Sequence, residues 1–119
     1  YQIHLASVKD DMETLLLLLQ AYTDNGQFSE LATITLDQIQ LFPTQPELYY
    51  YNGLANNQIQ NYKKAKDVLE SGVDFVIDNV TLEINFMIQL GEAYNGLGDS
   101  KKKEIYFKKA NELINKTKK

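Results

Sequence analysis

Apolar residues recur three or four positions apart along most of the chain, as they do on one face of an α-helix. No segment alternates strictly between apolar and polar residues, as a half-buried strand does. The sequence therefore predicts an all-α fold. In the N-terminal stretch the apolar positions with helical spacing are Leu5, Val8, Met12, Leu15, Leu19 and Tyr22.

Turn residues divide the chain into six predicted helices. The second is ended by Pro43, and Pro46 opens the third. The connections span only about two to four residues, so neighbouring helices should run antiparallel. The second to sixth helices should cover about 28–42, 47–59, 61–77, 81–97 and 99 to the C-terminal lysines.

The first predicted helix ends at Asn25-Gly26, and its start has two interpretations. Asp10 followed by Glu13 is a capping-box-like start. The apolar spacing from Leu5 onward carries the helix further back. Residues 1–11 are accordingly a leader or the end of a preceding element.

The predicted helices repeat along the chain. The two shifts that align them differ by four residues, about one helical turn. The helix near 80–87 should therefore be one turn longer, with its packing face kept in phase. A shift of 34 places Leu15 on Tyr49, Ala21 on Ala55, Phe28 on Tyr62 and Leu31 on Ala65. A shift of 38 places Gly53 on Gly91, Ala55 on Ala93, Leu69 on Phe107 and Gly72 on Ala110.

This repeat resembles the tetratricopeptide repeat (TPR) family over nearly the whole chain. The resemblance implies a right-handed α-solenoid of about six antiparallel helices, forming one domain of three helix hairpins. The repeats would cover about 12–45, 46–79 and 80–117. The clearest unit is the third, with Leu90-Gly91-Glu92-Ala93-Tyr94, Leu97-Gly98-Asp99, Phe107 and Ala110. The second offers Tyr49, Gly53, Ala55, Tyr62, Ala65, Leu69 and Gly72, and the first keeps Leu15, Leu18, Ala21, Tyr22, Gly26, Phe28 and Pro43.

Small residues at fixed positions should let paired helices approach closely. Gly53 is expected opposite Ala65, and Gly72 and Ala110 should admit a following helix. Leu19 and Leu31 occupy positions where the family prefers small residues, which predicts a splayed or rotated first hairpin.

Three polar residues stand at positions where the family has apolar ones. Lys103 replaces an alanine, and its aliphatic stem is expected along Gly91. Asn52 and Asn56 lie one turn apart on the same helix face. If buried, they need hydrogen-bond partners, which we expect in each other or in a neighbouring helix.

By the resemblance, the first helix of each hairpin lines a concave groove that takes an extended or helical peptide. Tyr50 and Tyr51 are the favoured contacts, although both rings could instead pack on adjacent helices. The amides Asn57, Gln58 and Gln89 could pair with a peptide backbone or simply be solvated. The candidate groove residues are Glu13, Leu16, Leu17, Gln20 and Asp24, then Tyr50, Tyr51, Leu54, Asn57 and Gln58, then Asn85, Ile88, Gln89, Glu92 and Asn95.

One function of the family is argued against. Chaperone-binding members hold a C-terminal carboxylate with a clamp of lysine, arginine and asparagine. Uncharged side chains cannot replace those cations. The matching positions here are Leu16, Gln20, Tyr51, Asn85 and Gln89.

The charge is distributed unevenly. Residues 101–119 carry eight lysines against Glu104 and Glu112, a balance of +6, and residues 1–100 carry four lysines against fourteen carboxylates, a balance of −10. Arginine, which guanine and bidentate phosphate recognition favour, is absent. The lysines fit better as the soluble end of a terminal helix, so we expect neither a nucleic-acid partner nor membrane insertion.

Residues for catalysis or metal binding are sparse. Cysteine is absent, and His4 is the only histidine. The carboxylates Asp10, Asp11 and Glu13 lack metal-loop spacing and fit a helix N-terminus better. We therefore expect no enzymatic activity, no metal and no cofactor.

The sequence thus predicts a non-enzymatic scaffold that binds a peptide or protein segment in its groove. An architectural spacer, or a segment that associates weakly with itself through its ends, is the alternative. A small-molecule or glycan site at Tyr50, Tyr51 and Asn57 is a third option. Residue usage suits a bacterial source, and no targeting signal indicates a compartment.

Overall fold

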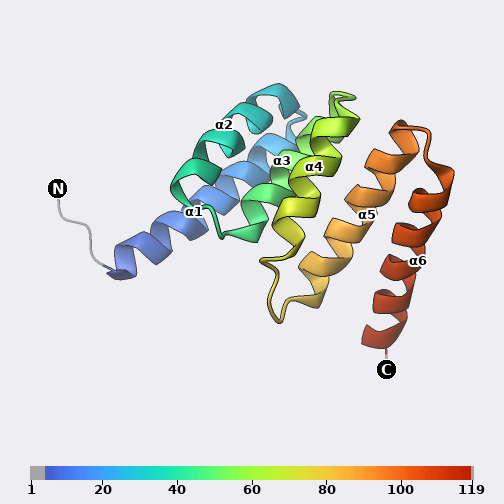
Figure 1. Cartoon of the computed structure of the whole chain (residues 1–119). Coiled ribbons are helices and arrows are strands. Elements are labelled where there is room, and N and C mark those ends of the chain that lie inside the picture. Colours follow the sequence, from blue (N-terminus) through green and yellow to red (C-terminus); the bar gives the residue numbers. More distant parts are fainter. Residues whose placement is uncertain (1–4, 119) are drawn as a thin grey trace.

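Six α-helices follow one another along the chain in a computed structural model, which describes the backbone of residues 5–118 and the side chains of residues 11–118 (Figure 1). The described residues are all-helical apart from their connections, as predicted. The helices are α1 (Leu5–Asp24), α2 (Phe28–Leu41), α3 (Pro46–Gln58), α4 (Tyr62–Val73), α5 (Val80–Gly96) and α6 (Ser100–Thr117).

Each helix packs against the next one in sequence, so the helices form a row from α1 to α6 (Figure 1). In addition α3 contacts both α1 and α5, whereas α2, α4 and α6 make no contacts with one another within residues 5–118. The odd-numbered helices therefore form a continuous layer, and the even-numbered helices stand apart on the other side. None of the helices of this part of the chain is long and apolar enough to cross a membrane.

Local signals account for most helix ends. Pro46 stands in the first turn of α3. The side chains of Asn79 and Asp99 accept hydrogen bonds from the backbone N–H of Leu82 (3.0 Å) and Lys102 (3.1 Å), and so cap α5 and α6. α1 begins as far back as Leu5, so the earlier of the two predicted starts is observed.

The end of α4 was predicted wrongly. The helix stops at Val73, four residues before Ile77, and two tight turns follow, with Phe75 N–H bonded to Gly72 O (3.0 Å) and Val76 N–H to Val73 O (3.1 Å). Phe75 and Val76 pack against the core from these turns. Burial of those side chains thus competes with another helical turn and wins.

The length difference between α3 and α5 confirms the interpretation of the two repeat shifts. α5 has 17 residues and α3 has 13. The four extra residues make one turn, and the equivalent positions Gly53 and Gly91 still meet equivalent partners, as the glycine contacts show.

Two glycines set the closeness of the second and third hairpins. A Cβ added to Gly53 would overlap Leu69, and one added to Gly91 would overlap the ring of Phe107. Both contacts join equivalent positions 38 residues apart. The expected partners were wrong: the nearest atoms at these glycines do not belong to Ala65 or Lys103.

Gly72 also differs from its expectation. Its missing Cβ makes room for Tyr49 on the preceding helix α3, not for a following helix. The Tyr49 ring also lies 5.6 Å from Phe75, measured between ring centroids. Gly72 therefore helps to close the second hairpin on itself.

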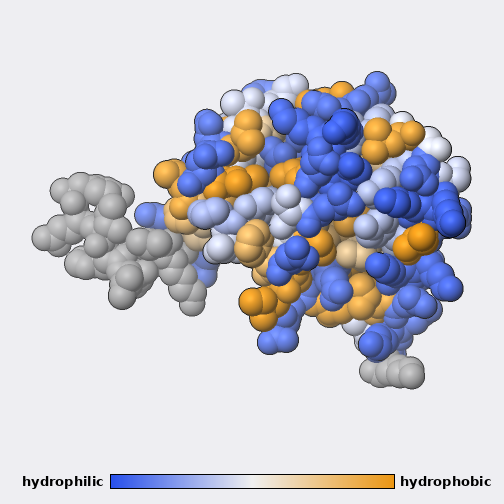
Figure 2. Space-filling view, in the orientation of Figure 1, coloured by the Kyte–Doolittle hydropathy of each residue, from blue (hydrophilic) through white to orange (hydrophobic). Residues whose placement is uncertain are grey.

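The core has two parts. One joins α3 to α6 and includes Phe86, Leu69 and Leu90. The other joins α1, α2 and the near side of α3 around Leu19 and Leu31, both fully buried. Elsewhere hydrophobic residues reach the surface in separate patches, some of them toward the end where α1 and α2 lie (Figure 2).

The buried amides on α3 form a connected network. Asn52 Nδ2 donates to Ala32 O and to Thr35 Oγ1, both at 3.0 Å on α2. Asn56 Nδ2 donates to Asn52 Oδ1 and Asn52 O, both at 2.9 Å. The expectation that these residues bond to each other and to a neighbouring helix is confirmed.

Candidate functional site

Asn57 and Gln89 join α3 to α5 on the odd-numbered layer. Asn57 Nδ2 donates to Gln89 O at 3.0 Å and to Gln89 Oε1 at 2.9 Å. The Asn57 side chain is therefore already used within the molecule, and Asn57 is only 7% exposed. This pair anchors the floor of the site.

Beside this pair lies a pocket of about 340 Å³. Six of the candidate groove residues line it, drawn from the end of α3 and the second half of α5. A prediction based on repeat position thus brings residues about 30 positions apart to one place. The lining residues are Asn57, Gln58, Gln60, Tyr62, Ile88, Gln89, Glu92, Asn95 and Gly96.

A second group of candidates meets where α1 and α3 touch. The Tyr51 hydroxyl donates to Gln20 Oε1 at 2.8 Å. The Tyr50 ring lies edge-on to Tyr51, with centroids 5.1 Å apart, and 6.1 Å from the ring of Phe86. Both tyrosines are half-buried, so each ring packs on its neighbours and keeps part of its surface open.

The hydroxyls of these two tyrosines stay protonated over a wide pH range. Burial raises the pKa of Tyr50. Burial also raises the pKa of Tyr51, and the neighbouring Tyr50 and two carboxylates, Asp24 and Glu47, raise it further. Both groups therefore remain neutral hydrogen-bonding groups and not anions at physiological pH.

The remaining candidates are placed less tightly. Leu17 is 73% exposed and is thus the most open large apolar side chain among them. Gln20 Nε2 also donates to Asp24 at 2.9 Å. Leu16, Leu54, Asn85 and Ile88 are partly buried, and Glu13, Asp24, Gln58, Glu92 and Asn95 are exposed.

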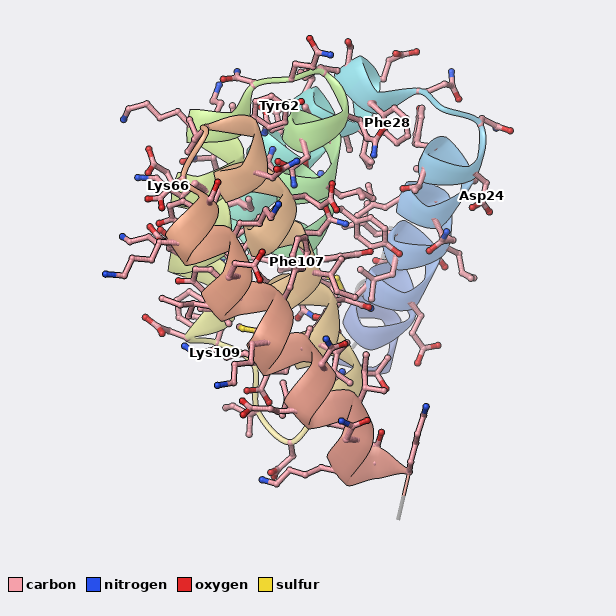
Figure 3. The ribbon with its side chains drawn as sticks, turned by 90° about the vertical axis from the view of Figure 1, so that its right-hand side faces the viewer. Asp24, Phe28, Tyr62, Lys66, Phe107 and Lys109 are labelled. Atoms are coloured by element: carbon pink, nitrogen blue, oxygen red, sulfur yellow. The ribbon has the colours of Figure 1, made fainter. Side chains whose placement is uncertain are left out.

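Sequence reasoning missed Gln60, Tyr62 and Gly96 as pocket residues. Gln60 stands at φ +66° in the α3–α4 turn, a backbone conformation that favours glycine. The equivalent positions are indeed Gly26 and Gly98, so the repeat alignment carried a signal. The ring of Tyr62, labelled in Figure 3, fills the space that a Cβ on Gly96 would occupy.

One polar atom of the site has no partner. Asn57 Oδ1 is buried and accepts no hydrogen bond within residues 11–118. A 180° flip of the amide would not help, because Gln89 O can only accept and must face the NH₂ group. An unpaired buried amide oxygen costs roughly 1–3 kcal/mol.

The pocket is electrostatically one-sided. Glu92 is its only charged lining residue, and no lysine lies among the described residues that line it. Another pocket, of about 390 Å³ between the start of α5 and the end of α6, combines Glu83 and Glu112 with Lys109 and Lys116, so its charges compensate. That pocket contains none of the candidate residues.

The odd-numbered layer offers little chemistry besides hydrogen bonding. Within the described residues, no three acidic or histidine side chains are grouped so that they could hold a metal ion. His4 and Ile3 lie outside the described residues. The five positions matched to the chaperone clamp, Leu16, Gln20, Tyr51, Asn85 and Gln89, bring together no cation. Comparison with known proteins adds no identity, since no family model and no curated protein matches the chain.

Proposed function

We propose that this chain is a non-enzymatic interaction module of the TPR type, which binds an extended or helical protein segment along the layer formed by α1, α3 and α5. One observation carries the proposal. Six candidate residues line one polar pocket at the α3–α5 junction, and the half-buried Tyr50 and Tyr51 lie on the adjoining stretch of α3.

The arrangement of the helices supports a TPR-like stack. The Gly53–Leu69 and Gly91–Phe107 contacts recur at equivalent positions, so the second and third hairpins close in the same way. The odd-numbered helices contact one another along the row, and the even-numbered helices do not. A row packed more closely on one side curves toward that side, which favours a trough along α1, α3 and α5.

The chemistry of the layer suits a peptide better than a metabolite. Tyr50 and Tyr51 offer ring surface and hydroxyls at low conformational cost. Gln58 and Asn95 are exposed amides at the pocket rim that can both donate to and accept from a peptide main chain. The absence of cations at the five clamp positions argues against capture of a carboxylate-ended tail.

Titration of the isotope-labelled chain with a peptide library tests this proposal by NMR. The backbone amide signals of Tyr50, Tyr51 and Gln89 should shift, and those of Thr33 on α2 and Ser71 on α4 should not. Tyr51→Ala should weaken binding about tenfold, and Tyr51→Phe, which keeps the ring, should weaken it less. Shifts confined to α2, α4 and α6 would exclude the odd-numbered layer as the binding face.

A specific observation favours a second function, self-association through the ends of the row. Leu90 and Ala93 on α5 are fully buried, as is Ala55 on α3. The equivalent residues on α1, Leu18 and Ala21, are exposed, Leu18 by 48%. This face of α1 thus lacks the preceding helix that covers α3 and α5.

The other end of the row is uncovered as well. Phe107 on α6 is partly exposed, whereas the equivalent Leu69 on α4 is fully buried. The balance of +6 in residues 101–119 complements the balance of −10 in the rest of the chain. The occupant that matches both shape and charge is a second copy of this chain, with its α1 seated on α6.

Sedimentation velocity over a range of concentrations tests this second function. The sedimentation coefficient should rise with concentration and fall with added salt. Leu18→Lys should abolish the rise, and Leu36→Lys, at a similarly exposed leucine (44%) on α2, should not. A strictly monomeric chain at every concentration would exclude end-to-end association.

A further inference from the structure

The pocket between α3 and α5 presents hydrogen-bond acceptors. Glu92 contributes a carboxylate, and Gln58, Gln60 and Asn95 contribute amide oxygens. Amides can also donate, so they alone do not select a charge. The single carboxylate, with no cation among the described lining residues, does.

The orphaned oxygen of Asn57 points to the same chemistry. Asn57 lines the pocket, and its NH₂ group is occupied by the two acceptors of Gln89. What remains at the wall is Oδ1, a buried acceptor with no partner within residues 11–118. A donor that enters the pocket and draws Oδ1 toward it would recover the hydrogen bond that folding leaves unmade.

The turn that borders the pocket supplies an independent argument. The three hairpin turns place Gly26, Gln60 and Gly98 at equivalent positions, with φ of +72°, +66° and +79°. Glycine adopts this conformation without strain and glutamine does not. The one strained position is also the one whose side chain lines the pocket, and local strain of this kind clusters at binding sites.

We propose that this pocket binds a cationic side chain, arginine before lysine, of the segment held along α1, α3 and α5. The inference rests on the proposed function and gives its partner a chemistry. A guanidinium has five donors in a fixed planar fork and no acceptor, so it can serve Glu92 and amide oxygens together. A lysine ammonium offers three donors from a single point and serves fewer acceptors at once.

The surroundings of the pocket agree with a basic partner. The candidate groove residues include Glu13, Asp24 and Glu92 and no lysine. Most of the lysines belong to α6, beyond the pocket, and those of α4 lie on the even-numbered side of the row. An acidic layer of this kind attracts basic segments and repels acidic tails.

The pocket can be tested with a small probe pair on the complete chain. N-acetyl-arginine methylamide is titrated into the isotope-labelled protein, and the citrulline analogue, which has nearly the same shape without the charge, is its control. We expect the arginine probe to shift the side-chain amide signals of Asn57 and Gln89 and to bind at least about fivefold more tightly than citrulline. Equal binding of the two probes, or no shift at these signals, would overturn the inference.

Two variants and one control link the effect to the pocket. Glu92→Gln should remove the preference for arginine, because Glu92 is exposed and its replacement leaves the packing intact. Gln60→Gly should weaken arginine binding about two- to threefold without loss of stability. Glu104→Gln, an exposed glutamate on α6, should change neither. Retention of the arginine preference in Glu92→Gln would contradict the assignment.

The outcome of the peptide-library titration separates this inference from the proposed function. If library peptides bind the α1–α3–α5 layer while the arginine probe does not discriminate, the inference fails and the interaction module stands. If neither probe nor peptide binds that layer, both fail. A matched peptide pair with lysine or acetyl-lysine then ranks ammonium against guanidinium.

Discussion

The first and third hairpins use opposite means to hold two helices together. In the third hairpin the position on α5 is Gly91, and the ring of Phe107 on α6 lies directly against it. At the equivalent positions the first hairpin has Leu19 and Thr35, both fully buried. The large side chain has moved from the second helix to the first, so the two hairpins fill similar space from opposite sides.

The exchange changes how closely the helices can pack. A glycine lets the backbone of one helix meet a ring on the other, and α5 and α6 contact each other along much of their length. With leucine at that position, α1 meets α2 over a shorter stretch, which agrees with the splayed first hairpin expected from Leu19 and Leu31. One residue at one repeat position thus decides whether a hairpin closes tightly.

The most severe test is to give the third hairpin the leucine of the first. Gly91→Leu places a side chain where Phe107 already lies, so α5 and α6 must separate. We expect a loss of more than about 3 kcal/mol in the free energy of unfolding, measured by urea denaturation and far-UV circular dichroism. Gly91→Ala should cost less but remain destabilising. An unchanged midpoint in both variants would show that the ring can move aside.

The next test addresses the core of the first hairpin. Leu19→Ala should cost about 2–4 kcal/mol, because the side chain is fully buried and leaves a cavity. The adjacent Leu18, 48% exposed, is the matched control, and Leu18→Ala should change stability by less than about 0.5 kcal/mol. Equal effects at the two leucines would mean that α1 is rotated from its described position.

A tyrosine that ties the third hairpin to the second gives a smaller effect with a pH signature. The Tyr94 hydroxyl donates to Glu70 on α4 at 2.6 Å, and burial, followed by this bond, raises its pKa well above the usual 10.0. At neutral pH Tyr94→Phe should cost about 1–2 kcal/mol.

The sign of the pH effect follows from the direction of the shift. Above pH 10.0 the unfolded chain releases the Tyr94 proton while the folded chain retains it, so stability falls as pH rises. The contribution is complete below pH 10.0 and is lost as pH approaches the folded-state pKa. Urea midpoints measured between pH 8 and 11 should therefore fall less steeply in Tyr94→Phe, and Glu70→Gln should reduce the slope as well. Parallel slopes in variant and parent would assign the alkaline loss to other tyrosines.

The smallest expected effect compares the turns of the hairpins. Gln60→Gly should raise stability by about 0.5–1 kcal/mol, because glycine accepts φ +66° without strain. The reverse exchange in the third hairpin, Gly98→Gln, should lower stability by about 1 kcal/mol. Both changes are measured as shifts of the urea midpoint. A destabilised Gln60→Gly would indicate that the glutamine side chain supports the turn.

The helices and their order followed from the sequence because their signals are local. Pro46, Asp99 and the glycine turns mark helix ends through backbone geometry alone, and the four-residue difference between repeat shifts predicted the extra turn of α5. The early end of α4 was missed because it depends on where Phe75 and Val76 find a core to pack against. That information is not present in local spacing.

The candidate site was predicted by position and not by pairing. Repeat position placed Asn57, Gln89 and Glu92 on one layer, and they line one pocket. The bond from Asn57 to Gln89 depends on the separation of α3 and α5, which packing elsewhere determines. The unpaired oxygen and the side chain of Gln60 could be recognised only once that separation was known.

The amide chain from Asn56 through Asn52 to Thr35 has a consequence for how α2 and α3 are aligned. Apolar surfaces tolerate sliding, since one leucine can replace another as a neighbour. Amides do not: a displacement of α3 by a single turn would separate Asn52 from both Ala32 O and Thr35 Oγ1 and strand their polar atoms in a dry interior. The network therefore acts as a notch that allows one seating of the first hairpin and rejects its near alternatives.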